Sequence, residues 1–146
     1  MVDAHTLFSW GDPLVLVGWA ALILSPLAPV WADRIAGFII PAILSLAYTG
    51  LILAFWSGAP GGFDSLENVM ALFTDPYIAL AGWLHFLAFD LFVGAWIVRQ
   101  ARAAAIPHLL TVPILVPAFL FAPAGYLAFI TLRAIWSLRT PAAQEA

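Results

Sequence analysis

Four long stretches of apolar residues, almost free of charge, constrain this chain more than any other feature of its sequence. A helix that crosses the hydrocarbon layer needs about 20 such residues, because each residue adds about 1.5 Å and the layer is about 30 Å thick. The stretches cover residues 13–31, 35–56, 76–98 and 108–138. They predict a single all-α domain, a polytopic membrane bundle with about four transmembrane helices.

The composition excludes a soluble domain and several kinds of chemistry. Charged residues make up 9% of the chain, whereas soluble domains carry about 25%. All basic residues are arginines and cysteine is absent, which excludes a lysine Schiff base, a disulfide, a thiolate nucleophile and an iron–sulfur cluster. With a net charge of −3 and no basic run, nucleic acid is not an expected partner. The expected partners are membrane lipids and a lipid-soluble small molecule.

The fourth stretch is longer than one crossing requires and contains three prolines. Pro113, Pro117 and Pro123 each remove a backbone donor, which is tolerated at membrane depth only where neighbouring helices or a cavity satisfy the freed carbonyls. We therefore expect this segment to be kinked or broken.

The loop between the second and third stretches contains a predicted short helix at about residues 65–73. Asp64 and Glu67 have the spacing of a capping box, with Asp64 as the N-cap residue. A stripe of apolar residues follows at helical spacing: Leu66, Val69, Met70 and Phe73. Such a helix is typical of the headgroup level, where it covers the mouth of the bundle or acts as a lid over a ligand.

The third stretch has clear sequence signals at both ends. Asp75 is a predicted N-cap, and Pro76 follows at the first helical position, where its missing N–H has no cost. Because proline disfavours helix in the residue before it, Pro107 ends the helix near Ile106.

The arginines suggest an orientation in the membrane. With four crossings, Arg34, Arg99 and Arg102 lie on one side, which the positive-inside rule assigns to the cytoplasm, so that both termini lie outside it. Arg133 and Arg139 then fall on the wrong side. A broken fourth segment that turns back would remove this conflict.

Two ionisable residues, His85 and Asp90, lie in the middle of the third stretch. A charge at this depth costs about 2.5–3.5 kcal/mol on insertion scales, so each residue is a candidate for a functional site. They differ in depth by about 7.5 Å and lie about 140° apart around the helix axis, so they do not share a face. Each therefore needs partners on other helices.

Candidate partners and ligand contacts surround these two residues. His85 is the weaker candidate, since Ser45, Tyr48 or Thr49 on the second stretch could hold it in a structural hydrogen bond. An aspartate in hydrocarbon pairs with a cation, for which Arg133 is available, or takes up a proton. The full set of predicted ligand contacts is Trp83, Phe86, Phe89, Gly94, Tyr48, Thr49, His108 and Arg133.

The sequence contains only weak signals for a metal site or a catalytic nucleophile. The three histidines form no His-x-x-x-His or Glu-x-x-His pair, and His85 and His108 offer only a poor match to haem ligation. No nucleophile elbow or phosphate-binding glycine loop is present. We predict no metal site and no cofactor.

Several segments together resemble a known family. The runs GGFDSLENVMALF, AGWLHFLAFDLFVGAW, IPHLL and FAPAGYLAF are similar to the abscisic-acid-deficient-four-like family of small four-helix membrane proteins, whose plant members are associated with neoxanthin synthesis. The family motif falls on Trp83, His85, Asp90, Leu91, Phe92, His108, Pro123 and Gly125. Ala122 stands where the plant pattern has cysteine, and the plant lysines are absent. The chain looks like a bacterial branch, which implies an inner-membrane location.

For this branch the resemblance implies the fold and a polar site but not a substrate, and the reaction of the plant members can be compared with these residues. The plant conversion of an epoxy-carotenoid to an allenic alcohol needs an acid at the epoxide oxygen and a base several bonds away, without a redox cofactor. His85 and Asp90 are the candidate acid–base pair, or else polar contacts for another carotenoid or a quinone. The alternatives are a non-catalytic pigment-binding, quinone-binding or assembly subunit of a larger membrane complex, and a small transporter that encloses its path as a homo-oligomer.

Overall fold

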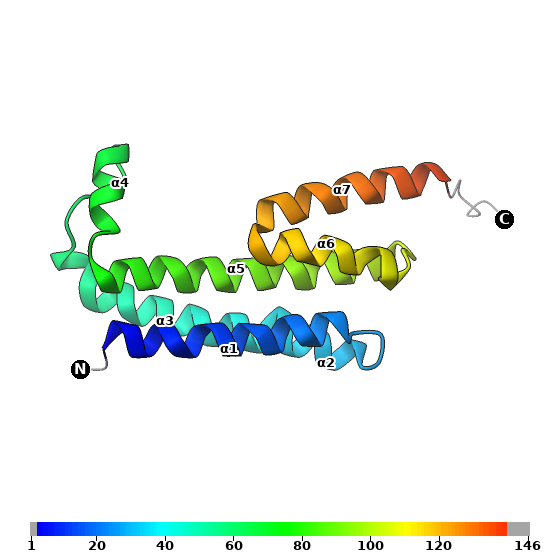
Figure 1. The fold of residues 1–146 in the computed structure, drawn as a ribbon, viewed down its shortest axis with the longest axis horizontal. Helices are drawn as coiled ribbons and strands as arrows, with labels where there is room; N and C mark the ends of the chain where they lie inside the picture. The colour runs from blue at the N-terminus through cyan, green and yellow to red at the C-terminus, as the bar shows by residue number, and fades with distance from the viewer. Residues whose placement is uncertain (1–2, 140–146) are drawn as a thin grey trace.

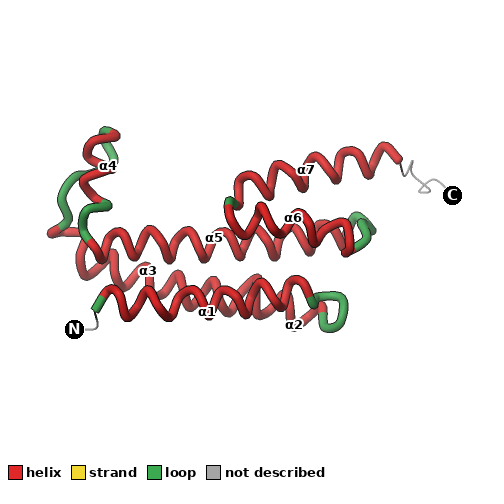
Figure 2. Tube along the Cα trace, viewed as in Figure 1, coloured by secondary structure: helices red, strands yellow, loops and turns green. Residues whose placement is uncertain are grey.

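The computed structural model describes residues 3–139, and every regular element in this range is helical (Figures 1 and 2). The elements, in chain order, are α1 (Ala4–Ile23), α2 (Pro29–Arg34), the π-helical segment η1 (Ile35–Ile39), α3 (Ile40–Phe55), the 3₁₀ turn η2 (Trp56–Gly58), α4 (Leu66–Leu72), α5 (Pro76–Ala103), α6 (His108–Leu120) and α7 (Ala122–Arg139). The predicted all-α class is confirmed for the part of the chain that is described.

Three helical stretches are long and apolar enough to cross a membrane. They are Ala4–Ile23, Pro29–Gly58 and Pro76–Ala103, while His108–Leu120 is shorter. In Figure 1 the long helices lie side by side, and α5 contacts α1, α3, α6 and α7. The protein is therefore a membrane helix bundle organised around α5, and a fourth full crossing is not confirmed.

The turn between the first two crossings lies earlier than the sequence suggested. We expected stretches at residues 13–31 and 35–56, separated near Asp33 and Arg34, but the turn lies between Ile23 and Pro29. Proline at the first position of α2 starts a new helix there. Asp33 lies within α2, and its carboxylate accepts two hydrogen bonds from Arg102 of α5, at 3.0 and 3.2 Å.

The fourth segment is broken and folds back on itself. Phe121 is extended, with φ −154° and ψ 90°, and α7 returns beside α6 (Figure 1). Pro123 accounts for the break, because in a continuous helix its ring would clash with the carbonyl four residues earlier. Residues 108–138 therefore form a hairpin and not one span.

The hairpin removes the conflict among the arginines. Arg133 donates a hydrogen bond to the side chain of Gln100 at 3.1 Å, so it lies beside the last turns of α5. Arg34, Arg99, Arg102 and Arg133 consequently share one end of the bundle (Figure 1). The positive-inside rule predicts that this arginine end faces the cytoplasm, and this orientation stays a prediction.

The short helix α4 forms where the sequence predicted it, but its cap differs. The hydroxyl of Ser65 accepts from the backbone N–H of Asn68 at 3.1 Å, so Ser65 and not Asp64 is the N-cap, and the expected capping box with Glu67 is absent. Asp64 instead accepts from the Asn68 side chain at 2.9 Å, and this bond lowers the pKa of the Asp64 carboxyl.

Most of the apolar stripe of α4 is not packed against the bundle, although the ring of Phe73 lies against Gly82 of α5. Leu66, Met70 and Phe73 are exposed and Val69 is half-buried, whereas Leu72 is buried. Figure 1 shows α4 standing away from the other helices at the beginning of α5. Leu66 and Met70 are thus free to contact lipid, and the position of this helix at the headgroup level stays a prediction.

Both ends of α5 are determined by hydrogen bonds between residues that are close in the sequence. The Asp75 carboxylate accepts from the backbone N–H groups of Tyr77 and Ile78 at 2.8 and 3.1 Å, which confirms the predicted cap. At the far end Ala105 has a positive φ of 53°, and the N–H of Ile106 reaches the carbonyl of Ala101 at 2.9 Å. This is a Schellman motif with alanine at the position that usually holds glycine.

Replacing Ala105 with glycine should stabilise the protein. A left-handed backbone costs a non-glycine residue about 1–2 kcal/mol, and Ala105→Gly removes most of that cost. We expect a higher midpoint of thermal unfolding in detergent, monitored by circular dichroism at 222 nm. A lower midpoint would contradict a left-handed conformation at this position.

Adding a methyl group at Gly125 should open the α6–α7 hairpin. A Cβ atom there would overlap the backbone of Ala118 on α6, whereas a Cβ at Gly50 meets nothing within 4 Å. Gly125→Ala should cost about 1–3 kcal/mol in the free energy of unfolding. The control Gly50→Ala should be neutral or stabilising by about 0.5–1 kcal/mol. Equal effects of the two substitutions would contradict the hairpin.

Candidate functional site

A groove of about 530 Å³ lies where the α6–α7 hairpin ends partway along α5. In Figure 1 the hairpin covers only part of α5, so beyond Phe121 the surfaces of α1 and α5 lack a third helix on that side. The residues that line it are mostly apolar, and four of them are aromatic. The full lining is Asp12, Val15, Leu16, Trp83, Phe86, Leu87, Phe119, Leu120 and Phe121. Its volume falls in the range of about 300–1,000 Å³ that is typical of small-molecule sites.

Asp90 is buried next to this groove and is not one of its lining residues. It follows Phe86 by about one turn on the same face of α5 and is 5% exposed. The backbone N–H of Ala122 donates a hydrogen bond to its carboxylate. Because Ala122 is the first residue of α7, Asp90 acts as a cap from another helix, next to unpaired N–H groups and the positive end of the helix dipole.

The cation that we expected for Asp90 is elsewhere. Arg133 bonds to Gln100 at the arginine end, so the predicted pairing of Arg133 with Asp90 is wrong. The reason is the hairpin, because α7 carries Arg133 away from the middle of α5. A helix N-terminus takes the place of the cation.

Two buried polar atoms near the groove have no hydrogen-bond partner among the described residues: Oδ2 of Asp90 and Nε1 of Trp19. The Trp19 indole meets Phe119, a lining residue, edge to face at 5.4 Å, and it follows Val15 on α1 by about one turn. An unmatched buried polar group costs about 1–3 kcal/mol and calls for an explanation. These two atoms, one donor and one acceptor, are buried about one helical turn beyond residues that line the groove.

Gly94 allows the ring of Trp19 on α1 to pack closely against α5. We expected the missing side chain to admit a ligand or another backbone, and the ring of Trp19 occupies that space, since a Cβ on Gly94 would lie 2.6 Å from Cη2 of the indole. Gly94 therefore positions Trp19 and does not line the groove.

His85 lies on a different face from Asp90, as their spacing predicted. Its side chain is exposed, and its ring contacts Phe89 and Tyr48 with centroids 4.6 and 5.7 Å apart. The Thr49 hydroxyl donates to the carbonyl of Ser45 within α3 at 2.8 Å and not to the histidine. His85 and Asp90 therefore lie on different faces of α5, and neither of them lines the groove.

The remaining predicted contacts divide between two places. Trp83 lines the groove, stacks on Phe86 at 5.5 Å and donates from its indole to Oδ1 of Asp12 at 3.1 Å. His108 lies at the arginine end, where its Nε2 donates to the carbonyl of Ile23 at 2.9 Å. His108 therefore does not belong to the groove.

Sequence reasoning missed Asp12 and Trp19. Both belong to a stripe at helical spacing, with Val15 and Leu16 between them, which faces α5. We overlooked this signal because Pro13 marked the expected start of the first helix, whereas α1 begins at Ala4 and includes Pro13. A helix that starts earlier places Asp12 on the wall of the groove.

Metal chemistry finds no support in the described residues. No group of three or more histidine, aspartate or glutamate side chains within residues 3–139 could hold a metal ion. The groove itself is lined by apolar and aromatic residues, one carboxylate, that of Asp12, and the indole of Trp83.

The ABA DEFICIENT 4-like family model matches residues 6–129 of the chain, a range that includes every residue of the groove. The protein belongs to this family. No curated protein and no solved structure matches the chain.

Removing the carboxylate of Asp90 should weaken the hairpin. Asp90→Ala leaves the N–H of Ala122 without an acceptor, and we expect a loss of about 1–3 kcal/mol in the free energy of unfolding. Asp90→Asn keeps an oxygen acceptor and should cost less than half as much. Titration with sodium dodecyl sulfate from a mild detergent measures both values. An unaffected Asp90→Ala variant would rule out the capping role.

Proposed function

We propose that this ABA DEFICIENT 4-like membrane protein binds an isoprenoid, such as a carotenoid or a quinone, in the groove between α1, α5 and the α6–α7 break. The observation that carries the proposal is the pair of unpartnered buried atoms, Asp90 Oδ2 and Trp19 Nε1, beside an aromatic apolar groove. We further propose that the membrane is a bacterial inner membrane, with the arginine end in the cytoplasm.

The chemistry of the groove suits a molecule with a long apolar chain and a polar end. Aromatic and aliphatic walls favour a polyene or prenyl chain, and exposed residues such as Leu16 leave the groove open to lipid. Next to the groove, behind its lining residues, the indole N–H of Trp19 can donate to a ligand oxygen, while the carboxylate of Asp90 can accept from a hydroxyl group that reaches past the lining. The ligand would satisfy both unmatched atoms at once.

The two carboxylates also suit an isomerisation by proton transfer. Asp12 bonds to Trp83, and Trp83 and Asp90 are seven residues apart on α5, or about 10.5 Å along its axis. One group would give a proton to an oxygen of the ligand and the other would take a proton from a carbon several bonds away, without any redox change. In this proposal Asp12 replaces His85 as the partner of Asp90.

A separate hypothesis applies to His85. Because it is exposed beside Tyr48 and Phe89, it could act only on a ligand at the outer face of α3 and α5, or at a contact with another copy or a larger complex. A non-catalytic binding subunit is the second candidate function. The observation that favours it is the structural role of Asp90 as the cap of α7.

The test compares variants in a carotenoid-producing bacterial host. The protein is purified in mild detergent, and its bound isoprenoids and the pigments of the cells are separated by chromatography. We expect Asp90→Asn and Trp19→Phe each to reduce the bound isoprenoid about tenfold or more, since the loss of one buried hydrogen bond costs about 1–3 kcal/mol. His85→Ala should leave it unchanged.

The outcomes separate the candidate functions. A new pigment that disappears with Asp12→Asn or Asp90→Asn supports an isomerase, and bound pigment without conversion supports a binding subunit. Loss of binding with His85→Ala alone would favour the outer face over the groove. Folded wild-type protein that carries no isoprenoid and changes no pigment would contradict the proposal.

A further inference from the structure

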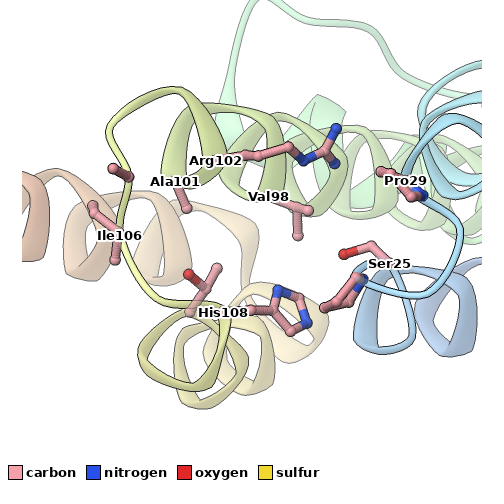
Figure 3. Close-up of a pocket in the computed structure, with 10 residues that line it drawn as sticks. Ser25, Pro29, Val98, Ala101, Arg102, Ile106 and His108 are labelled. Carbon is pink, nitrogen blue, oxygen red and sulfur yellow. The ribbon is translucent and has the colours of Figure 1, made fainter.

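A second cavity, of about 370 Å³, lies at the arginine end of the bundle. The turn between α1 and α2, the last turns of α5 and the beginning of α6 form its walls (Figure 3). It shares no lining residue with the isoprenoid groove. Its chemistry is also different, because Ser25, Arg102, His108 and Thr111 contribute polar groups to the lining.

Three polar groups of this cavity can donate hydrogen bonds to a ligand: the hydroxyls of Ser25 and Thr111 and the guanidinium of Arg102. Ser25 is 3% exposed and Thr111 is fully buried, and both border the cavity. Figure 3 shows Ser25 and His108 turned toward the same space, with Arg102 near its rim. The Thr111 hydroxyl has only a long contact of 3.4 Å with the carbonyl of Pro107, so it is available to a better acceptor.

Arg102 retains donors of its own. Its two terminal nitrogens each give one hydrogen bond to Asp33, at 3.0 and 3.2 Å. A guanidinium has five N–H groups in total, so three stay available. Asp33 does not line the cavity, and therefore no carboxylate opposes an anion inside it.

The charged residues around this cavity favour the binding of an anion. This end of the bundle carries Arg34, Arg99, Arg102, Arg133 and Arg139, and Asp33 is the single acid among the described residues there. By the positive-inside rule this end faces the cytoplasm, where the leaflet is rich in anionic lipid. Basic pockets between transmembrane helices on that side are suited to lipid headgroups.

We infer that this cavity binds the phosphate group of an anionic phospholipid. The phosphate oxygens accept hydrogen bonds from Arg102, Ser25 and Thr111, and the acyl chains extend into the bilayer around α1 and α6. A phosphate has no donor requirement, so a site made of donors with no facing carboxylate matches it. Through these hydrogen bonds the bound lipid would connect the α1–α2 turn with the start of α6.

The test measures the thermal unfolding of the full chain in neutral detergent during titration with short-chain phosphatidylglycerol. A ligand that binds only the folded state raises the midpoint. We expect a saturable rise of about 5 °C. Phosphatidylcholine with the same chains, and sodium phosphate at the same concentration, should each give less than a third of this shift. An equal shift with phosphatidylcholine would overturn the requirement for an anion, and an equal shift with free phosphate would overturn the lipid assignment.

Variants show whether the cavity or only the general charge of this end is responsible. Arg102→Gln should reduce the apparent affinity for phosphatidylglycerol about tenfold. The matched control Arg34→Gln removes the same charge at the same end, where Arg34 lies over the ring of Trp31 at 5.5 Å, outside the cavity. It should leave the affinity within twofold. Equal losses in the two variants would overturn the site.

A second variant covers the case in which the loss of the Asp33 partner prevents folding. The double substitution Ser25→Ala with Thr111→Val removes two hydroxyl donors and leaves the ion pair of Arg102 intact. It should weaken phosphatidylglycerol binding about tenfold, while isoprenoid binding in the groove stays unchanged. Unchanged lipid affinity in this variant would contradict the proposal, whatever the result at the groove.

Discussion

A backbone inside hydrocarbon must satisfy its own polar groups, and this chain breaks a helix at that depth. At Phe121 the α6–α7 hairpin exposes the N-terminus of α7, and the Asp90 carboxylate accepts from the N–H of Ala122 there. The contact explains how an acidic residue and a helix break exist together in the bundle. Each would be costly alone, and together they compensate part of that cost.

The hairpin also determines where the two cavities form. Since α6 begins at the arginine end and stops partway along α5, it closes one region of the bundle and leaves the groove open beyond its tip. The return of α7 brings Arg133 to Gln100 and gathers the described arginines at one end. The apolar groove thus depends on where α6 ends, whereas the cavity at the arginine end depends on where α6 begins.

The candidate site was predicted only in part. The depth of Asp90 and the aromatic residues Trp83 and Phe86 could be recognised from spacing and hydropathy. The partners could not, because the helices are apolar on every side and their sequence does not indicate which face is covered. Asp90 is 5% exposed and His85 is exposed, although both lie in the same apolar run. Packing against α1 and α6 made that distinction.

By itself, the sequence determined the features that depend on neighbouring residues. These are the helical class, the interruption near Pro123 and the cap at Asp75. Each could be predicted because hydropathy, proline geometry and capping act over a few residues. Only the tertiary structure decided that α7 turns back, that Trp19 fills the space above Gly94 and that Arg102 pairs with Asp33. These contacts join segments far apart in the chain, and in an apolar solvent they are selected by packing and hydrogen bonding between helices, not by the hydrophobic pattern along one of them.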